Sequence, residues 1–384
     1  MARARAACRQ KAVLSAPAAR KLRALELTLH GHRVRNQQLV GGLLQSPAAI
    51  VSWLGAVQSQ DYAGAKWGLA QRGYGITNRA IDDAFDHGRI LRTHVMRPTW
   101  HFVSPDDIRW IQSLTAPRVH AANGSMYRTL ELDPKTLART RRTIERALTK
   151  DDALTRPELQ TALRHAGVHA EGHRLAYVVM DAELEQVICS GPRRGTQFTY
   201  ALLDRRAPRA RRRARDEARL ELTRRYFASH GPATVRDFSW WSGLTMKESR
   251  EGVQAARPFL TSETVGDRTY WFVTPAGGRV DRPASAYLLP NYDECLIAYK
   301  DRGSVIEPSA GPALSDFYAH HVLIGDRVVG SWREIERQSE SIEVHVHRPL
   351  TTAESRAIAA AGRAYSSFVE RPVAIVVVSS DTRV

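Results

Sequence analysis

The sequence predicts an α+β protein in which three similar helical units in tandem precede a β-rich C-terminal region. Two observations lead to this prediction. Apolar residues recur at helical spacing through most of the first 275 positions, and each helical group ends in two β-type runs around a short turn. Beyond about Pro275, the runs SAYLLP, HHVLIGDRVVGSW, SIEVHVH and PVAIVVV are of β type, and one helix interrupts them.

The first unit is expected over residues 26–125. In the segment SPAAIVSWLGAV, Ser46 is the expected N-cap and Pro47 takes the first helical position, ahead of apolar residues at helical spacing. The β-type runs ILRTHV and TWHFV then flank a basic turn that contains Arg97 and Pro98. Helices followed by a basic hairpin are the winged-helix plan, in which the hairpin is the wing.

The same plan is expected in a second unit over residues 126–205. Thr155 precedes a helical pattern and Glu158 follows it by three positions, which is the spacing of a capping box. The runs EQVICSG and TQFTYALL flank Arg193 and Arg194, so the sequence predicts a second basic wing here.

The third unit, expected over residues 206–275, contains the clearest helix-turn-helix. A short helix, a turn at Gly243 and a helix capped by Thr245 with Glu248 follow one another, and TVGDRTYWFV closes the unit as a hairpin. The β-rich region, residues 276–384, is expected to pack on the winged units, with TTAESRAIAAAGRAYSSFV as its helix.

The chain is strongly basic, with 56 Lys and Arg against 40 Asp and Glu and a formal net charge of +16. This surplus favours a polyanionic partner, because cationic side chains near phosphates release condensed counterions. Nucleic acid is the leading candidate and an anionic membrane surface the second. The run RRAPRARRRAR over residues 205–215 is either a solvated linker or a strip that contacts phosphates.

Composition argues against several other classes of protein. The three cysteines, Cys8, Cys189 and Cys295, lack the spacing of a zinc site or a disulfide framework, so no metal or cofactor is expected. A reducing compartment follows, namely the cytoplasm, with the protein at the nucleoid. Residues 1–25 lack the apolar core of a secretory signal and are expected to be a disordered basic extension. No apolar run is long enough to span a membrane.

Three segments carry a resemblance to a known family. AVQSQDYAGAKWGLAQR, THVMRPTWHFVSPDDIRW and LLPNYDECLIAYKDR occur in this order, and together they resemble the winged-helix DNA glycosylase family typified by AlkZ. The resemblance runs from about Leu27 to near the C-terminus. AlkZ-type members carry Gln, any residue, Gln, whereas the more distant YcaQ branch has Asp second. Gln58-Ser59-Gln60 matches the AlkZ type, at what looks like the end of an apolar helix.

The resemblance implies that Gln58 and Gln60 are catalytic and that three tandem winged helices form a C-shape around DNA. The implied substrates are N7-alkylated purines, including bulky guanine adducts. Such a base is cationic, so breaking its glycosidic bond neutralises it, and the sugar passes through an oxocarbenium ion. Glutamine carbonyls can hold the attacking water and stabilise this cation by their dipoles. We therefore expect a monofunctional DNA glycosylase without lyase activity; crosslink unhooking is a further hypothesis.

Other polar residues near these segments are candidates for DNA binding. Several have a structural alternative: Arg97 as a solvated turn residue, His101 as a hydrogen-bonded core histidine and Asp293 as one half of an ion pair. Asp61 follows Gln60 and is expected to cap the next helix. The DNA-binding candidates are Lys66, Arg97, His101, Arg193, Arg194, Asn291, Tyr292, Asp293 and Lys300.

Two other functions fit parts of the sequence. A DNA-binding transcriptional regulator without enzymatic activity would also need winged units and positive charge, and it would prefer one sequence strongly over random DNA. An enzyme directed at RNA is a more distant alternative. No heptad pattern or long dimerisation helix is apparent, so we expect a monomer that wraps double-stranded DNA.

Overall fold

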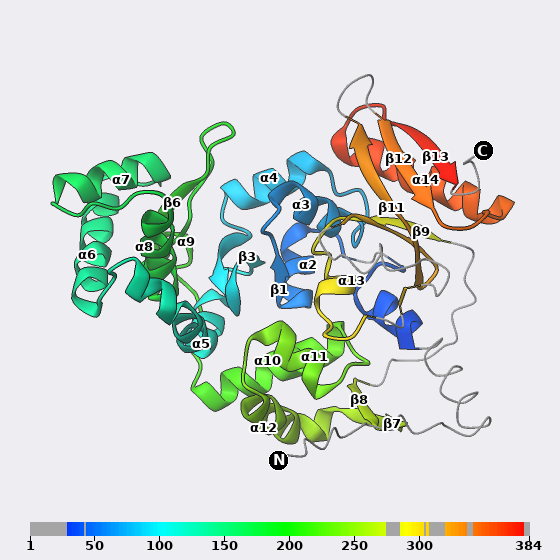
Figure 1. Cartoon of the computed structure of the whole chain (residues 1–384), viewed down its shortest axis with the longest axis horizontal. Coiled ribbons are helices and arrows are strands. Elements are labelled where there is room, and N and C mark those ends of the chain that lie inside the picture. Colours follow the sequence, from blue (N-terminus) through cyan, green and yellow to red (C-terminus); the bar gives the residue numbers. More distant parts are fainter. Residues whose placement is uncertain are drawn as a thin grey trace, which may run out of the picture.

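Four bodies of secondary structure make up the chain (Figure 1). The first winged unit lies in the middle of the view, with the second to its left, the third below and the C-terminal sheet at the upper right. The predicted extension over residues 1–25 lies outside the described residues. The structure is a computed structural model that describes residues 29–41, 44–273, 285–302, 305–306, 319–335 and 341–379.

The first unit has the element order helix, strand, helix, helix, strand, strand. Its three strands form an antiparallel sheet in the order β1-β3-β2. Ser46 is the N-cap of α2 as predicted, because its side chain accepts a hydrogen bond from the Ala49 backbone nitrogen at 3.2 Å. The elements are α2 (Pro47–Leu54), β1 (Ala56–Gln58), α3 (Tyr62–Ala70), α4 (Asn78–Asp86), β2 (Leu91–Val95) and β3 (Arg97–Val103).

The glutamine motif does not follow a helix directly, so that expectation was wrong. Helix α2 ends at Leu54, Gly55 reverses the chain with φ at 83°, and the strand β1 pairs with β3 before the motif is complete. Val57, the last residue of SPAAIVSWLGAV, fits the helical spacing of the apolar residues before it only by coincidence. A strand of three residues is too short to impose its own period on the sequence.

The second unit repeats the plan, with its strands in the order β4-β6-β5. Its capping box is present: Thr155 and Glu158 exchange side-chain to backbone hydrogen bonds at 2.6 and 3.4 Å. The loop over residues 191–198 projects as the second wing (Figure 1). The elements are α6 (Pro134–Lys150), β4 (Leu154–Thr155), α7 (Arg156–His165), α8 (Gly172–Leu184), β5 (Ile188–Ser190), β6 (Thr199–Leu202) and α9 (Leu203–Arg206).

The helix α5 (Ile108–Thr129) joins the first two units, so the boundary expected at residues 125/126 falls inside its last turn. In the third unit, Gly243 is left-handed with φ at 71° between the two helices of the predicted helix-turn-helix. Ala233 pairs with Trp271 and supplies the third strand position. The elements are α10 (Arg215–Ser229), α11 (Val235–Ser242), α12 (Met246–Ala256), the 3₁₀ turn η1 (Arg257–Phe259), β7 (Thr261–Val265) and β8 (Arg268–Phe272).

The C-terminal region is β-rich, as predicted. Five strands form one sheet in the order β13-β12-β11-β10-β9, and α14 makes the crossover between the parallel strands β12 and β13. The elements are β9 (Ala286–Leu289), α13 (Glu294–Ile297), β10 (His321–Ile324), β11 (Arg327–Ile335), β12 (Ser341–Val346), α14 (Thr352–Val369) and β13 (Ala374–Ser379). Among all described helices, none is long and apolar enough to cross a membrane.

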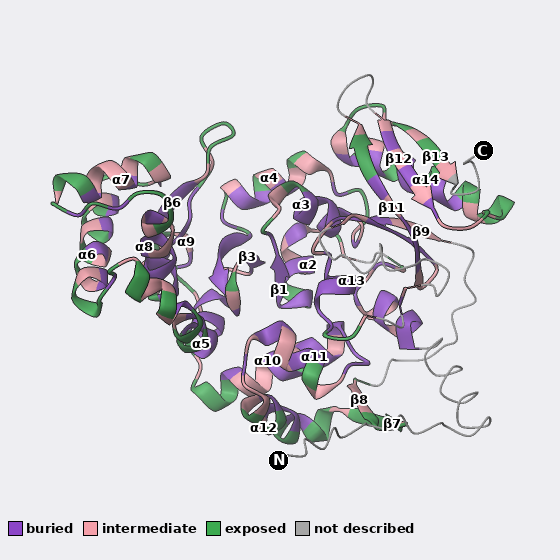
Figure 2. Cartoon of the chain, in the orientation of Figure 1, coloured by how far each residue is buried: buried purple, intermediate pink, exposed green. Residues whose placement is uncertain are grey.

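The C-terminal sheet and the first unit share one core, which confirms the expected packing. The indole of Trp67 lies 5.0 Å from the ring of Tyr365 and 5.2 Å from that of Phe368, between centroids. Its nitrogen donates to the Leu288 carbonyl at 2.6 Å. Buried residues run through the first unit and on into β9 and α13 (Figure 2). The shared core therefore fixes the first unit to α14 and β9 of the C-terminal region.

The turn of the first hairpin packs against the third unit. Met96, with φ at 65°, is buried in the same cluster as Trp241 of α11. Gly243 lies so close that a Cβ atom there would overlap the backbone carbonyl of Met96. This wing is therefore an internal contact between two units.

We predict that Gly243→Ala destabilises the protein by roughly 3 kcal/mol or more, because it adds a clash with backbone to left-handed strain. Gly172→Ala is the matched control: its φ is 50° and a Cβ there meets nothing within 4 Å, so only about 1–2 kcal/mol of strain is expected. Denaturant unfolding of both variants measures the difference. Equal losses of stability would show that the hairpin does not press on this turn.

Candidate active site

Gln58 is held on both its backbone and its side chain. It ends β1 opposite His101 of β3 and is 6% exposed. Its backbone nitrogen donates to Oε1 of Glu294 at 2.9 Å, and its side-chain Oε1 accepts from Nη2 of Arg97 at 2.7 Å. The side chain is therefore fixed in one orientation.

Arg97 determines which way the Gln58 amide faces. A guanidinium group has only donors, so the amide oxygen must point toward it and the amide nitrogen away. The oxygen keeps one lone pair for a second donor. Arg97 begins β3 after the buried hairpin turn and is half-buried, so the alternative of a solvated turn residue does not hold.

The rest of the motif is held by the same strand. Ser59 donates from its backbone nitrogen to the Trp100 carbonyl at 2.8 Å, and its own carbonyl accepts two bonds from Arg92 at 2.9 and 3.2 Å. Gln60 is exposed, and its Oε1 accepts from the Trp100 backbone nitrogen at 3.4 Å. Both amide oxygens of the motif thus accept hydrogen bonds from β3.

Two neighbours of the motif have structural roles. Asp61 caps α3, as predicted, because its carboxylate accepts from the Gly64 backbone nitrogen at 3.1 Å. Trp100 is half-buried between the ring of His94, 4.6 Å away, and the guanidinium of Arg92, 4.3 Å away. The Trp100 indole is therefore oriented, and its residue contacts Gln60 through the backbone; the sequence predicted no site role for it.

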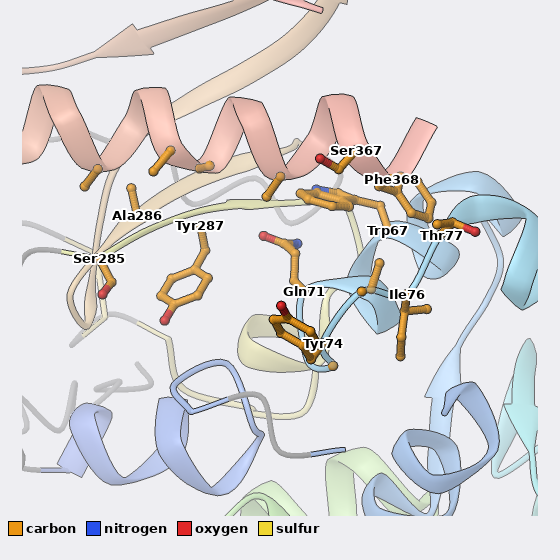
Figure 3. A pocket seen from close by; sticks show the side chains of 17 residues that line it. Trp67, Gln71, Tyr74, Ile76, Thr77, Ser285, Ala286, Tyr287, Ser367 and Phe368 are labelled. Atoms are coloured by element: carbon orange, nitrogen blue, oxygen red, sulfur yellow. The ribbon is translucent and has the colours of Figure 1, made fainter. Parts of the chain in front are cut away.

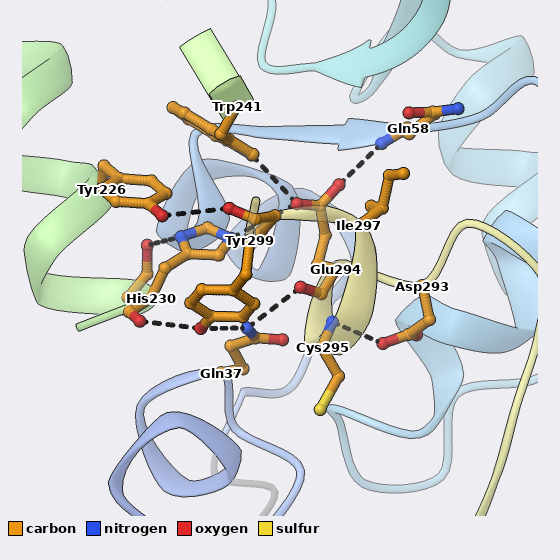
Figure 4. A network of polar contacts seen from close by, with 12 residues as sticks. Gln37, Gln58, Tyr226, His230, Trp241, Asp293, Glu294, Cys295, Ile297 and Tyr299 are labelled. Carbon is orange, nitrogen blue, oxygen red and sulfur yellow. Dashed lines mark hydrogen bonds and ion pairs between the residues drawn. The ribbon is translucent and has the colours of Figure 1, made fainter. Parts of the chain in front are cut away.

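Glu294 lies at the centre of a buried polar network behind the motif (Figure 4). Its Oε2 accepts from the Trp241 indole at 2.9 Å and lies 3.4 Å from Nε2 of His230. The carboxylate is 1% exposed. Burial by itself raises its pKa, but the contacts with His230 and the Gln58 backbone hold the pKa below its ordinary value. Glu294 is therefore a buried anion.

Asp293 forms a buried ion pair, as its structural alternative predicts, and this burial argues against the predicted contact with DNA. Its carboxylate receives two hydrogen bonds from Arg72, at 2.7 and 2.8 Å, and both side chains are at most 2% exposed. It also accepts from the Cys295 backbone nitrogen at 2.8 Å and so caps α13. This pair fixes α13 to the end of α3.

Lys66 and His101 were also predicted to bind DNA, and the structure places both inside the protein. The Lys66 ammonium is bonded to Asp82 at 2.7 Å and is buried, and this burial lowers its pKa. His101 has no exposed surface, and burial lowers its pKa to about 3, which leaves it neutral. Its ring nitrogen Nδ1 lies 2.9 Å from the Thr99 carbonyl, so it matches the alternative of a hydrogen-bonded core histidine. The residue type of Lys66 does not show that Asp82 would be its partner in the folded chain.

The other candidates lie at or near the surface, and their contact with DNA stays a prediction. Arg193 is half-buried and bonded to Asp86 at 2.8 Å, while Arg194 is exposed and paired with Glu158 at 2.7 Å. Lys300 is exposed above the ring of Trp240, 4.3 Å from its centroid. The half-buried residues of the turn before α13 are Asn291 and Tyr292.

A cavity of about 650 Å³ lies elsewhere, between α3, β9 and α14 (Figure 3). Aromatic and small residues line it, among them Trp67, Tyr74, Tyr287 and Phe368. None of its lining residues is charged, and it contains neither glutamine of the motif. Neither phosphate binding nor acid–base chemistry fits this cavity. Among the residues that the structure describes, no cluster of His, Cys, Asp or Glu could hold a metal ion.

Comparison with known proteins identifies the family of the chain. The model of the family described as DNA glycosylase AlkZ-like matches residues 51–368. The chain belongs to the AlkZ-like DNA glycosylase family. It is therefore a DNA glycosylase, and family membership favours the enzyme over a regulator without activity.

One similar protein sequence and one similar solved structure both come from Streptomyces sahachiroi. An interstrand DNA cross-link repair glycosylase is 24% identical over 324 residues, covering 80% of this chain and 87% of the relative. The solved structure of DNA glycosylase AlkZ matches with a TM-score of 0.76 at 21% identity, over 92% of this chain and 98% of that one. The structural match shows a shared fold, and the predicted fold class and family are confirmed.

The two lysines give a matched prediction. Lys300→Gln should weaken binding to duplex DNA and reduce the slope of log affinity against log salt by about 1, because one phosphate contact is lost. Lys66→Gln should leave the slope unchanged and lower the melting temperature, because Asp82 loses one of its two cationic partners. Titrations at several salt concentrations and thermal unfolding measure both effects. The reverse pattern would restore Lys66 as the DNA contact.

Proposed function

We propose that the chain hydrolyses the N-glycosidic bond of cationic N7-alkylated purines in duplex DNA, with Gln58 and Gln60 as catalytic residues. The observation that carries this proposal is the way β3 holds both amide oxygens. Each accepts one hydrogen bond from β3, from Arg97 or from the Trp100 backbone, and keeps a second lone pair. Two oriented neutral acceptors suit a water molecule and a sugar cation.

The chemistry follows from the leaving group. The bond from C1′ to N9 breaks, and its electron pair passes to the cationic purine and neutralises it. Water then adds to C1′ and releases a proton to solvent, which leaves an abasic site. The amide oxygens accept hydrogen bonds from this water and present their negative dipole ends to the cationic sugar. A strong base is unnecessary because the departing base is already activated.

Hydrolysis without a Schiff base is part of this proposal. The lysine nearest in sequence to the motif is Lys66, whose ammonium is buried and bonded to Asp82. A lysine nucleophile must be accessible to the sugar, and the Lys66 side chain is 8% exposed. The geometry thus supports a monofunctional glycosylase that leaves strand cleavage to other enzymes.

Bulky adducts and interstrand crosslinks are proposed as substrates within the same class. The relative named an interstrand DNA cross-link repair glycosylase supports this extension. The exposure of Gln60 supports it too, because a large adduct need not enter a closed pocket to reach an exposed amide. Release of one strand from a defined crosslinked duplex tests it; an intact crosslink beside active excision of monoadducts would restrict the enzyme to monoadducts.

Part of the basic run over residues 205–215 is proposed to contact the DNA backbone. Arg205 and Arg206 have protein partners, the carboxylate of Asp152 and the carbonyls at the end of α4. Arg213 lies over the ring of Trp110, and Arg215 bonds to Glu248. The remaining three, Arg209, Arg211 and Arg212, are exposed, and their guanidinium groups bond to no other described residue. These three form the unpaired strip between α9 and α10. Both alternatives for the run therefore apply, each to different arginines.

We predict that Gln58→Ala and Gln60→Ala each lower single-turnover base release from N7-methylguanine duplexes roughly 100-fold or more, because an oriented acceptor is lost. Binding to the same duplex should change little. Gln254→Ala, at an exposed position of α12, is the matched control and should retain activity. Free base and alkali-labile abasic sites report the reaction. Full activity of both variants would remove the motif from the mechanism.

A further inference from the structure

We propose that Glu294 is a positioning residue whose buried charge tunes the site: it holds β1 in place and offsets the charge of Arg97, so that Gln58 faces a sugar cation. This inference rests on the proposed glycosidic hydrolysis. It assigns to the C-terminal region a part in the reaction, because Glu294 begins α13, 236 residues after Gln58.

β1 is an edge strand in the order β1-β3-β2, and such a strand leaves a row of unpaired backbone groups on its outer side. The Gln58 backbone nitrogen lies on that side, and Glu294 accepts its hydrogen bond at 2.9 Å. The carboxylate thus takes the place of a further strand at the residue that the reaction needs.

Contacts with two other parts of the protein hold the Glu294 carboxylate rigidly. The other carboxylate oxygen accepts from the Trp241 indole of the third unit at 2.9 Å. Directly before Glu294, Asp293 is bonded through both oxygens to Arg72 of the first unit. The short helix α13 is therefore fixed between two winged units, as Figure 4 shows for the Gln58 and Trp241 contacts. Movement of either unit would displace the Gln58 backbone.

The negative charge of Glu294 offsets the positive charge of Arg97. Arg97 brings a half-buried cation to within 2.7 Å of the Gln58 amide oxygen, and a cation there opposes the positive charge that develops on the sugar. Glu294 is the anion whose charge acts on Arg97 most directly. The carboxylate also faces His230, 3.4 Å away, and the neutral His101, and its charge acts on Arg72 and Tyr226 as well. Arg302 is a second cation near Arg97. In this low-dielectric interior, an anion offsets Arg97 far more strongly than it would in water.

The test compares two abasic-site analogues in the same duplex, one with a tetrahydrofuran and one with a pyrrolidine, which is cationic at neutral pH. Wild type should bind the pyrrolidine duplex more tightly, because it mimics the sugar cation. Glu294→Gln keeps an oxygen for the Gln58 backbone and removes the charge, so the ratio of the two affinities should fall roughly tenfold. The affinity for tetrahydrofuran DNA should stay the same.

Trp241→Phe is the matched control, because it removes one hydrogen bond to the same carboxylate and leaves its charge, so the ratio should be unchanged. If Glu294→Gln does not fold, Arg97→Gln provides the test with the opposite sign: the anion is then unopposed, and the ratio should rise. An unchanged ratio in the charge variants would overturn the inference. No preference for pyrrolidine in wild type would instead contradict the proposed sugar cation.

Discussion

The hydrogen bond between the Gln58 backbone and the buried carboxylate of Glu294 is the constraint on which the site depends. A strand of three residues has little stability of its own, and β1 gains order only because it is bonded on both sides, to β3 and to α13. The chain must therefore complete its C-terminal region before the motif near its beginning is fixed. Core packing of Trp67 against α14 reinforces the same long-range connection.

The winged units share one plan, but the first and third units use it in different ways. Winged helices commonly read DNA with the helix that precedes the hairpin. In the first unit this helix is α4, whose Asp82 and Asp86 are bonded to Lys66 and Arg193, so an acidic surface faces other protein groups there. The third unit contributes Trp241 to the rear of the site instead. The first and third winged units thus support a hairpin-held motif, and we propose that general positive charge supplies the attraction to DNA.

Local signals made most of the fold predictable, and long-range partners made part of the site unpredictable. Capping boxes at Thr155 and Thr245 involve residues three positions apart, so the sequence contains both halves. The motif itself was found by resemblance, not by its surroundings. Lys66 and Asp293 were assigned to DNA because nothing local identifies Asp82 or Arg72, the latter 221 residues from Asp293. Glu294 directly follows Asp293 in the segment LLPNYDECLIAYKDR, but its proposed role depends on the backbone nitrogen of Gln58, 236 residues away.

The central claim is that two oriented neutral amides suffice because the departing base is cationic. The most direct measurement compares single-turnover base release by wild type from matched duplexes that carry N7-methylguanine, uracil or hypoxanthine. We expect free N7-methylguanine and an abasic site from the first duplex and no release from the two neutral bases. Release of a neutral base at a comparable rate would mean that the site contains a stronger catalyst than Gln58 and Gln60. No release from any cationic adduct would contradict the proposed substrate class.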